Sequence, residues 1–113
     1  MLNVLVTMRF EEAQLDPLRA VSPELRVTRD DPETADYSRT DILYAGTPPR
    51  DLSRAPHLKW VQLHMAGVNA LYDHPLYTES AIPLRCSELF AENLRRYLDG
   101  APLLNLVDRA KGY

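Results

Sequence analysis

Short apolar segments recur along the sequence between polar or amphipathic ones, and this alternation constrains the fold more than any other feature. These segments predict strands at residues 3–7, 25–27, 42–45 and 58–63, with a weaker fifth strand at 82–84. They are short and rich in β-branched residues and leucine, which favours buried strands over amphipathic helices. Because helical segments separate them, the pattern predicts a three-layer α/β fold whose helices cover a mostly parallel, five-stranded sheet.

Two longer stretches show the residue spacing of helices. Residues 11–20 have apolar side chains at near-helical spacing, but Asp16 and Pro17 resemble an N-cap and a first helical position, so the helix is predicted to begin at either place. Residues 87–98 have one apolar face, and Gly100 follows where a helix needs a left-handed residue. Shorter helices are predicted at residues 52–55 and 66–72.

The chain has 113 residues, which is the size of one domain. Its single cysteine, Cys86, excludes an intrachain disulfide framework and a four-cysteine zinc site. Its apolar segments are too short to cross a bilayer, and residues 1–6 resemble a first strand more than a secretory signal. We therefore expect a soluble, cytoplasmic protein that does not bind membranes.

Charge and glycine content exclude several classes of ligand. The net charge of -3 gives no positive field to attract nucleic acid. The four glycines stand at positions 46, 67, 100 and 112, so neither the glycine-rich dinucleotide turn nor the phosphate-binding P-loop is present. Met8-Arg9 and Gly46-Thr47 occupy the places where a receiver domain has its acidic residues.

The histidines and the cysteine give no clear catalytic or metal site. His57, His64 and His74 lack the spacing of ligands on one helix, so no metal site is predicted. Cys86 would need a base and a lowered pKa to act as a nucleophile, and a half-buried thiol explains it more simply. Independent catalysis by Cys86 or His64 stays open as an alternative.

The most informative stretch runs from a predicted strand through Met65-Ala66-Gly67 into a predicted helix. Ligands of open α/β sheets bind outside the carboxyl ends of the strands, and the N–H groups of a helix start attract anions. Gly67 would let a ligand approach the backbone closely. An ordinary strand-to-helix turn is the alternative interpretation.

Residues 55–62 and 66–69 resemble the substrate domain of the D-isomer-specific 2-hydroxyacid dehydrogenases, especially the glyoxylate/hydroxypyruvate reductase branch. Residues 88–98 and 103–113 resemble the last helix and the C-terminal tail of that family. The resemblance implies a flavodoxin-like substrate domain, which a Rossmann domain interrupts in the complete enzyme. It also implies that the complete enzyme reduces 2-oxo acids such as glyoxylate or hydroxypyruvate with NAD or NADP.

In this sequence, residues 82–84 run directly into residues 85–87, without a Rossmann domain between them. The resemblance therefore implies an engineered or truncated protein, in which an N-terminal part (1–84) joins the returning helix and tail (85–113) to form a single domain (1–113). The family's catalytic arginine, glutamate and histidine lie in the missing part, as do its glycine fingerprint and its acidic ribose ligand. No catalytic, cofactor-binding or metal-binding residue is assigned here.

Matched positions imply a partial substrate site. The backbone of Met65, Ala66 and Gly67 resembles the family's loop for the substrate carboxylate, and Gly46 and Thr47 resemble the neighbouring wall of the cleft. Met65 replaces the small serine that is common before Ala-Gly, which changes the pocket size. His64 does not match the family's acid/base histidine.

The expected function is that of a substrate domain which is inactive by itself, because the hydride donor and the acid/base are absent. One alternative is a module that binds small carboxylates weakly, with a Kd of about 1 mM or more. Another is a structural domain that self-associates through the former domain interface instead of remaining a monomer.

Overall fold

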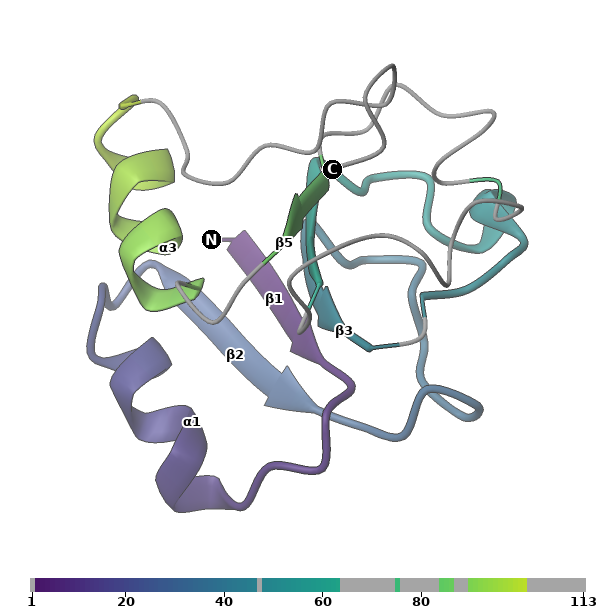
Figure 1. The fold of residues 1–113 in the computed structure, drawn as a ribbon, viewed down its shortest axis with the longest axis horizontal. Helices are drawn as coiled ribbons and strands as arrows, with labels where there is room; N and C mark the ends of the chain where they lie inside the picture. Colours follow the sequence, from purple (N-terminus) through teal and green to yellow (C-terminus); the bar gives the residue numbers. More distant parts are fainter. Residues whose placement is uncertain (1, 47, 64–74, 76–83, 87–89, 102–113) are drawn as a thin grey trace.

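The strands of this protein assemble into one parallel sheet (Figure 1). The computed structural model describes residues 2–46, 48–63, 75, 84–86 and 90–101. The strands are β1 (Leu2–Val6), β2 (Leu25–Arg29), β3 (Ile42–Ala45), β4 (Trp60–Leu63) and β5 (Leu84–Cys86). Their order is β2-β1-β3-β4-β5, and each neighbouring pair is parallel. This is the strand order of flavodoxin-like proteins, so the predicted fold class is confirmed.

Side chains that alternate along β1, β3 and β4 form two apolar cores, one on each face of the sheet. In β1, Val4 and Val6 belong to one core and Leu5 belongs to the other. The first core lies under helices α1 (Glu12–Arg19) and α3 (Phe90–Leu98), which lie side by side on one face of the sheet (Figure 1). On the other face, the core includes Tyr37 from the connection after β2, and Leu52 of the 3₁₀ helix η1 (Leu52–Arg54) packs against it.

Helix α1 begins at Glu12, so the interpretation that it begins at Asp16 is wrong. Gln14 Oε1 accepts a hydrogen bond from the backbone N–H of Glu11 at 2.7 Å, and this bond caps the first turn. Pro17 lies inside the helix, where it has no N–H to donate. The helix ends at Arg19, two residues after this proline.

Several predicted boundaries shift in the structure. Leu84, the last residue of the predicted fifth strand, lies in β5 (Leu84–Cys86), which pairs with Val61–Leu63 of β4, while residues 82–83 lie outside the described residues. The predicted helix at 52–55 is the 3₁₀ turn η1, and α3 is described from Phe90 onward. The predicted join after Leu84 falls within β5, and the predicted helix at 66–72 lies outside the described residues.

Gly100 ends α3 with a φ of 72°, as the sequence predicts. Its N–H donates to the Tyr97 carbonyl at 3.2 Å, and the Ala101 N–H donates to the Arg96 carbonyl at 2.8 Å, which is a Schellman motif. No atom lies within 4 Å of a Cβ built at this position. We expect Gly100→Ala to lower the free energy of unfolding by about 1 kcal/mol through backbone strain alone. Urea denaturation checks this, and an unchanged midpoint would contradict the left-handed conformation.

The outer edge of the sheet at β2 is covered in part by a side chain of α1. The Leu2 N–H donates to the Glu24 carbonyl, so the carbonyls of alternate residues of β2 face β1 and the Val27 carbonyl faces outward. Arg19 donates to that carbonyl at 3.3 Å. Glu12 holds the same guanidinium at 2.7 Å, and this contact raises the pKa of Arg19. The pair protects an edge that would otherwise present free backbone groups.

Candidate functional site

The carboxyl ends of β1 and β3 lie side by side and form the switch point of the sheet. Thr7, directly after β1, donates its N–H to the carbonyl of Tyr44 in β3 at 3.0 Å. From here the chain leaves β1 toward β2 on one side and leaves β3 toward β4 on the other. Open α/β sheets bind ligands at such a point, so the geometry indicates this edge as the candidate site.

Gly46 is the predicted site residue that the structure describes, and it lies at this edge, half-buried directly after β3. A Cβ added to Gly46 would lie 3.4 Å from Met8 Sδ. A larger side chain at position 46 would therefore fill the space beside Met8. The other predicted substrate-binding residues, Thr47, Met65, Ala66 and Gly67, lie outside the described residues, so the carboxylate loop stays a prediction.

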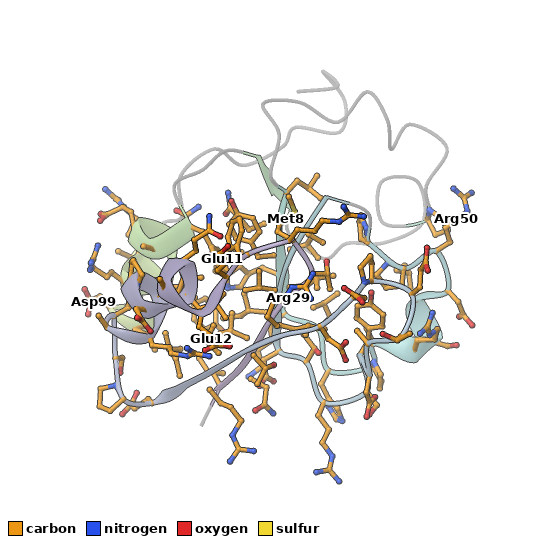
Figure 2. The ribbon with its side chains drawn as sticks, turned by 90° about the horizontal axis from the view of Figure 1, so that it is seen from below. Met8, Glu11, Glu12, Arg29, Arg50 and Asp99 are labelled. Carbon is orange, nitrogen blue, oxygen red and sulfur yellow. The ribbon has the colours of Figure 1, made fainter. Side chains whose placement is uncertain are left out.

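Arg29 fixes the turn that follows β1, a role that the sequence did not indicate. Its Nε donates to the Met8 carbonyl at 2.9 Å, and its Nη2 lies 3.0 Å from Asp31 Oδ1. Figure 2 labels Met8 and Arg29, which lie close together in that view from below the molecule. Arg29 thus joins the end of β2 to the Met8 side of the switch point.

Two buried side-chain atoms of the described residues have no hydrogen-bond partner, namely Thr7 Oγ1 and Trp60 Nε1. Burying such a group without a partner costs about 1–3 kcal/mol. Trp60 lies at the amino end of β4, whereas Thr7 lies at the switch point. Thr7 therefore brings unused hydrogen-bonding capacity to the candidate site.

A buried amide pair fastens α3 to β4, the strand that leads toward the predicted carboxylate loop. Asn93 Nδ2 donates to Gln62 Oε1 at 3.0 Å, and both residues are 0% exposed. A buried amide must satisfy its polar atoms inside the protein, so this pair fixes how the helix sits on the strand. No sequence pattern predicts this pair, because a lone Gln or Asn is usually exposed.

The other chemically active side chains are dispersed. Asp51 accepts hydrogen bonds from the Ser53 hydroxyl at 2.6 Å and from its N–H at 3.1 Å, which lower the pKa of Asp51, so this carboxylate serves as a cap of η1. His57 is exposed, while His64 and His74 lie outside the described residues. Among described residues, no group of His, Cys, Asp and Glu is placed to hold a metal ion, and no helix is long and apolar enough to span a membrane.

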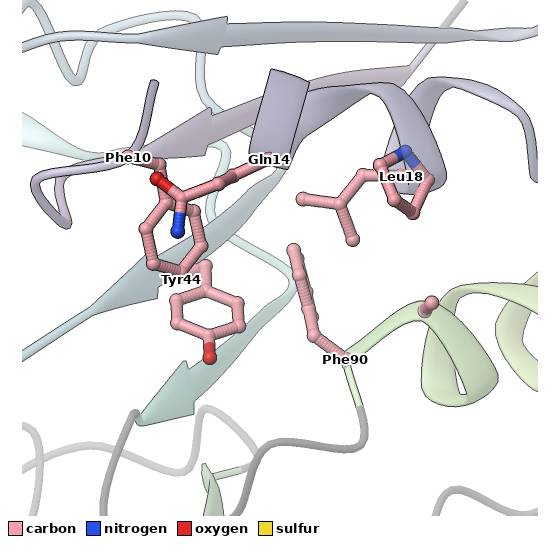
Figure 3. Close-up of a pocket in the computed structure, with 7 residues that line it drawn as sticks. Phe10, Gln14, Leu18, Tyr44 and Phe90 are labelled. Atoms are coloured by element: carbon pink, nitrogen blue, oxygen red, sulfur yellow. The ribbon is translucent and has the colours of Figure 1, made fainter. Parts of the chain in front are cut away.

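A cavity of about 430 Å³ opens between α1 and α3 on the helix-covered face of the sheet (Figure 3). We call it the aromatic cavity, and its described lining is Phe10, Gln14, Pro17, Leu18, Tyr44, Phe90 and Ala91. No sequence pattern predicts this cavity. Its aromatic residues are far apart in the chain, and the strand order is needed to bring them together.

No protein-family model and no curated protein matches the chain. Solved structures with a similar fold include a D-isomer specific 2-hydroxyacid dehydrogenase from Xanthobacter autotrophicus Py2, in complex with NADPH and MES. Its TM-score is 0.57 at 22% identity, covering 74% of this chain and 28% of that one. An NADPH-dependent glyoxylate/hydroxypyruvate reductase from Sinorhizobium meliloti, in complex with NADP and sulfate, has a TM-score of 0.52 at 27% identity. It covers 76% of this chain and 28% of that chain.

Part of each enzyme shares this fold. The chain spans 28% of the length of either dehydrogenase. The structural neighbours thus belong to the family that the sequence resembles.

Proposed function

We propose that this chain is the substrate-binding domain of an NAD(P)-dependent 2-hydroxyacid dehydrogenase and presents its carboxyl sheet edge to a small 2-oxo or 2-hydroxy acid. The similarity to the glyoxylate/hydroxypyruvate reductase, at 27% identity over 76% of this chain, carries the proposal. In the proposed arrangement, Gly46 keeps one wall of the site open. The backbone at Met65–Gly67 receives the substrate carboxylate.

The residues present do not fit a nicotinamide dinucleotide. A dinucleotide site of this fold needs clustered glycines after the first strand, so that the backbone can approach the pyrophosphate. Here Thr7 and Met8 follow β1, and the Met8 sulfur lies against the position of Gly46. We therefore propose that the cofactor and the acid/base that complete the reaction come from outside this chain, and that the chain alone does not turn over substrate.

A titration of the ¹⁵N-labelled protein tests the proposal. Glycolate is expected to shift the amide signals around Gly46 with a Kd of about 1 mM or weaker. Glycolamide, its neutral counterpart, is expected to leave them in place. NADPH should cause no saturable shifts, and the protein should not oxidise NADPH in the presence of glyoxylate. Catalytic turnover, or saturable binding of NADPH, would overturn the proposal.

A matched pair of variants locates the binding. Gly46→Val places a branched side chain beside Met8 and is expected to weaken glycolate binding. Ser38→Val alters an exposed turn elsewhere and should leave it unchanged. Equal affinities in both variants would place the acid away from the carboxyl edge.

A further inference from the structure

The side chain of Met8 borders the wall of the candidate site that Gly46 forms. A Cβ built at Gly46 would lie 3.4 Å from Met8 Sδ and 3.9 Å from Met8 Cε, so the thioether end of Met8 lies beside the space that this glycine leaves. Met8 is half-buried and packs against the margin of the core under α1 and α3. Because Met8 follows β1, the uncovered part of its side chain lies at the carboxyl edge of the sheet.

The backbone of Met8 is held by two hydrogen bonds. Its carbonyl accepts from the Phe10 N–H and from Arg29 Nε, both at 2.9 Å. Asp31 Oδ1 lies 3.0 Å from Arg29 Nη2, and the Arg29 side chain is 26% exposed. Because Arg29 is the last residue of β2, the root of the Met8 side chain is fixed to the sheet and not only to its own turn.

The end of the same side chain is adaptable. Methionine is unbranched, has three rotatable bonds and carries a polarizable sulfur, so it fits irregular spaces. A β-branched residue at this position would be restricted at χ1. A fixed root with an adaptable end lets Met8 pack against a small group and obstruct a large one.

The strand order indicates which part of an acid Met8 would meet. The proposed function places the carboxylate after β4, and β3 separates β4 from β1. Neighbouring strands lie about 4.8 Å apart, so Met8 stands about 10 Å from the end of β4. A small acid bound there by its carboxylate would end before Met8, whereas a longer group on its C2 would reach the thioether.

We propose that Met8 sets the size of the 2-oxo or 2-hydroxy acid that the carboxyl edge accepts, and that Arg29 is the positioning residue that holds Met8 in place. Acids with hydrogen or methyl on C2 fit in front of Met8, and a branched alkyl group collides with it. This inference rests on the proposed function, which places the acid at this edge.

Three acids of increasing size test the role of Met8. Glycolate carries hydrogen on C2, D-lactate carries methyl and D-2-hydroxyisocaproate carries isobutyl, while all three share the carboxylate and the hydroxyl. Amide chemical shifts of the natural protein are expected to show that 2-hydroxyisocaproate binds about tenfold more weakly than glycolate. Met8→Ala should remove this difference. Met8→Leu, whose side chain is one atom shorter at similar volume, should reduce it and serves as the test if Met8→Ala does not fold.

Two further variants separate size selection from packing. Leu2→Ala removes as many atoms as Met8→Ala from a half-buried side chain of the same core, but at the amino end of β1. It should leave the ratio of the two affinities unchanged. Arg29→Lys keeps the charge but loses the planar group that reaches both the Met8 carbonyl and Asp31. It should weaken the discrimination while glycolate binds as before.

The methyl group of Met8 reports the contact directly. In protein labelled with ¹³C at the methionine methyl groups, the Met8 signal is the one that Met8→Leu lacks, and D-2-hydroxyisocaproate at high concentration should shift it more than glycolate does. Glycolate without saturable shifts would overturn the proposed function and this inference together. Glycolate binding with the same ratio of affinities in folded Met8→Ala and Met8→Leu as in the natural protein would overturn the role of Met8 alone.

Discussion

Replacing Phe90 with alanine is expected to lower the free energy of unfolding by about 4 kcal/mol, the usual cost of deleting a fully buried phenylalanine ring. Phe90 is 1% exposed and contacts both Tyr44 and Trp60, with centroid distances of 4.5 and 5.5 Å. Its ring is therefore the main contact between the start of α3 and the strands β3 and β4. Folded domains have a free energy of unfolding of about 5–15 kcal/mol, so this loss removes a large fraction of the stability.

Urea denaturation followed by the fluorescence of Trp60, the one tryptophan of the chain, measures this loss. Phe10→Ala is the matched control, because Phe10 is a half-buried ring with a more distant contact to Tyr44, at 5.7 Å. We expect the control to cost about 1 kcal/mol. If both variants cost the same, α3 does not dock through Phe90.

The second large effect is expected at the buried amide pair. Asn93→Leu should lower the free energy of unfolding by about 3 kcal/mol, because it removes the buried amide that donates to the buried oxygen of Gln62. Gln62→Leu should have a similar effect. The double variant removes both members of the bond, so its cost should fall short of the sum of the single costs by about 1 kcal/mol or more.

Thermal and urea denaturation of the four proteins in this cycle give the coupling. Asn3→Leu is the control, because the Asn3 amide donates to the Arg39 carbonyl at an exposed position. Its cost should stay below about 1 kcal/mol. Additive costs at positions 62 and 93 would show that the two amides do not depend on each other.

Local sequence patterns predicted the strands and the last helix well, because burial forces apolar residues into those positions. Leu43 and Val61 are fully buried in β3 and β4, and Phe90 and Leu94 form the buried face of α3. Asp16-Pro17 misled the prediction of α1, because the hydrogen bond between Glu11 and Gln14 starts the helix earlier and the chain accepts a proline within it.

The candidate site was harder to predict than the fold. Gly46 lies at the carboxyl edge of the sheet, directly after a strand that the sequence predicts, but the contact of Arg29 with Met8 depends on how β1 and β2 are paired. The aromatic cavity was also not predictable from residue spacing, because its rings come from a loop, a strand and a helix. Residue spacing predicts which side chains share a face of one helix or strand. The contact between Arg29 and Met8 and the contacts between the rings of the cavity join different elements, which come together only through the order of the strands in the sheet.

The Arg19 side chain of helix α1 donates a hydrogen bond to the outward-facing carbonyl of Val27 in β2. Helix α1 therefore covers part of the outer edge of β2 through a side chain. A partial unfolding that moves α1 away from the sheet would also remove the Arg19 guanidinium and expose the outer edge of β2. Local melting of α1 and intermolecular strand pairing are therefore linked events in this molecule, because loss of the helix also exposes a strand edge that can template aggregation.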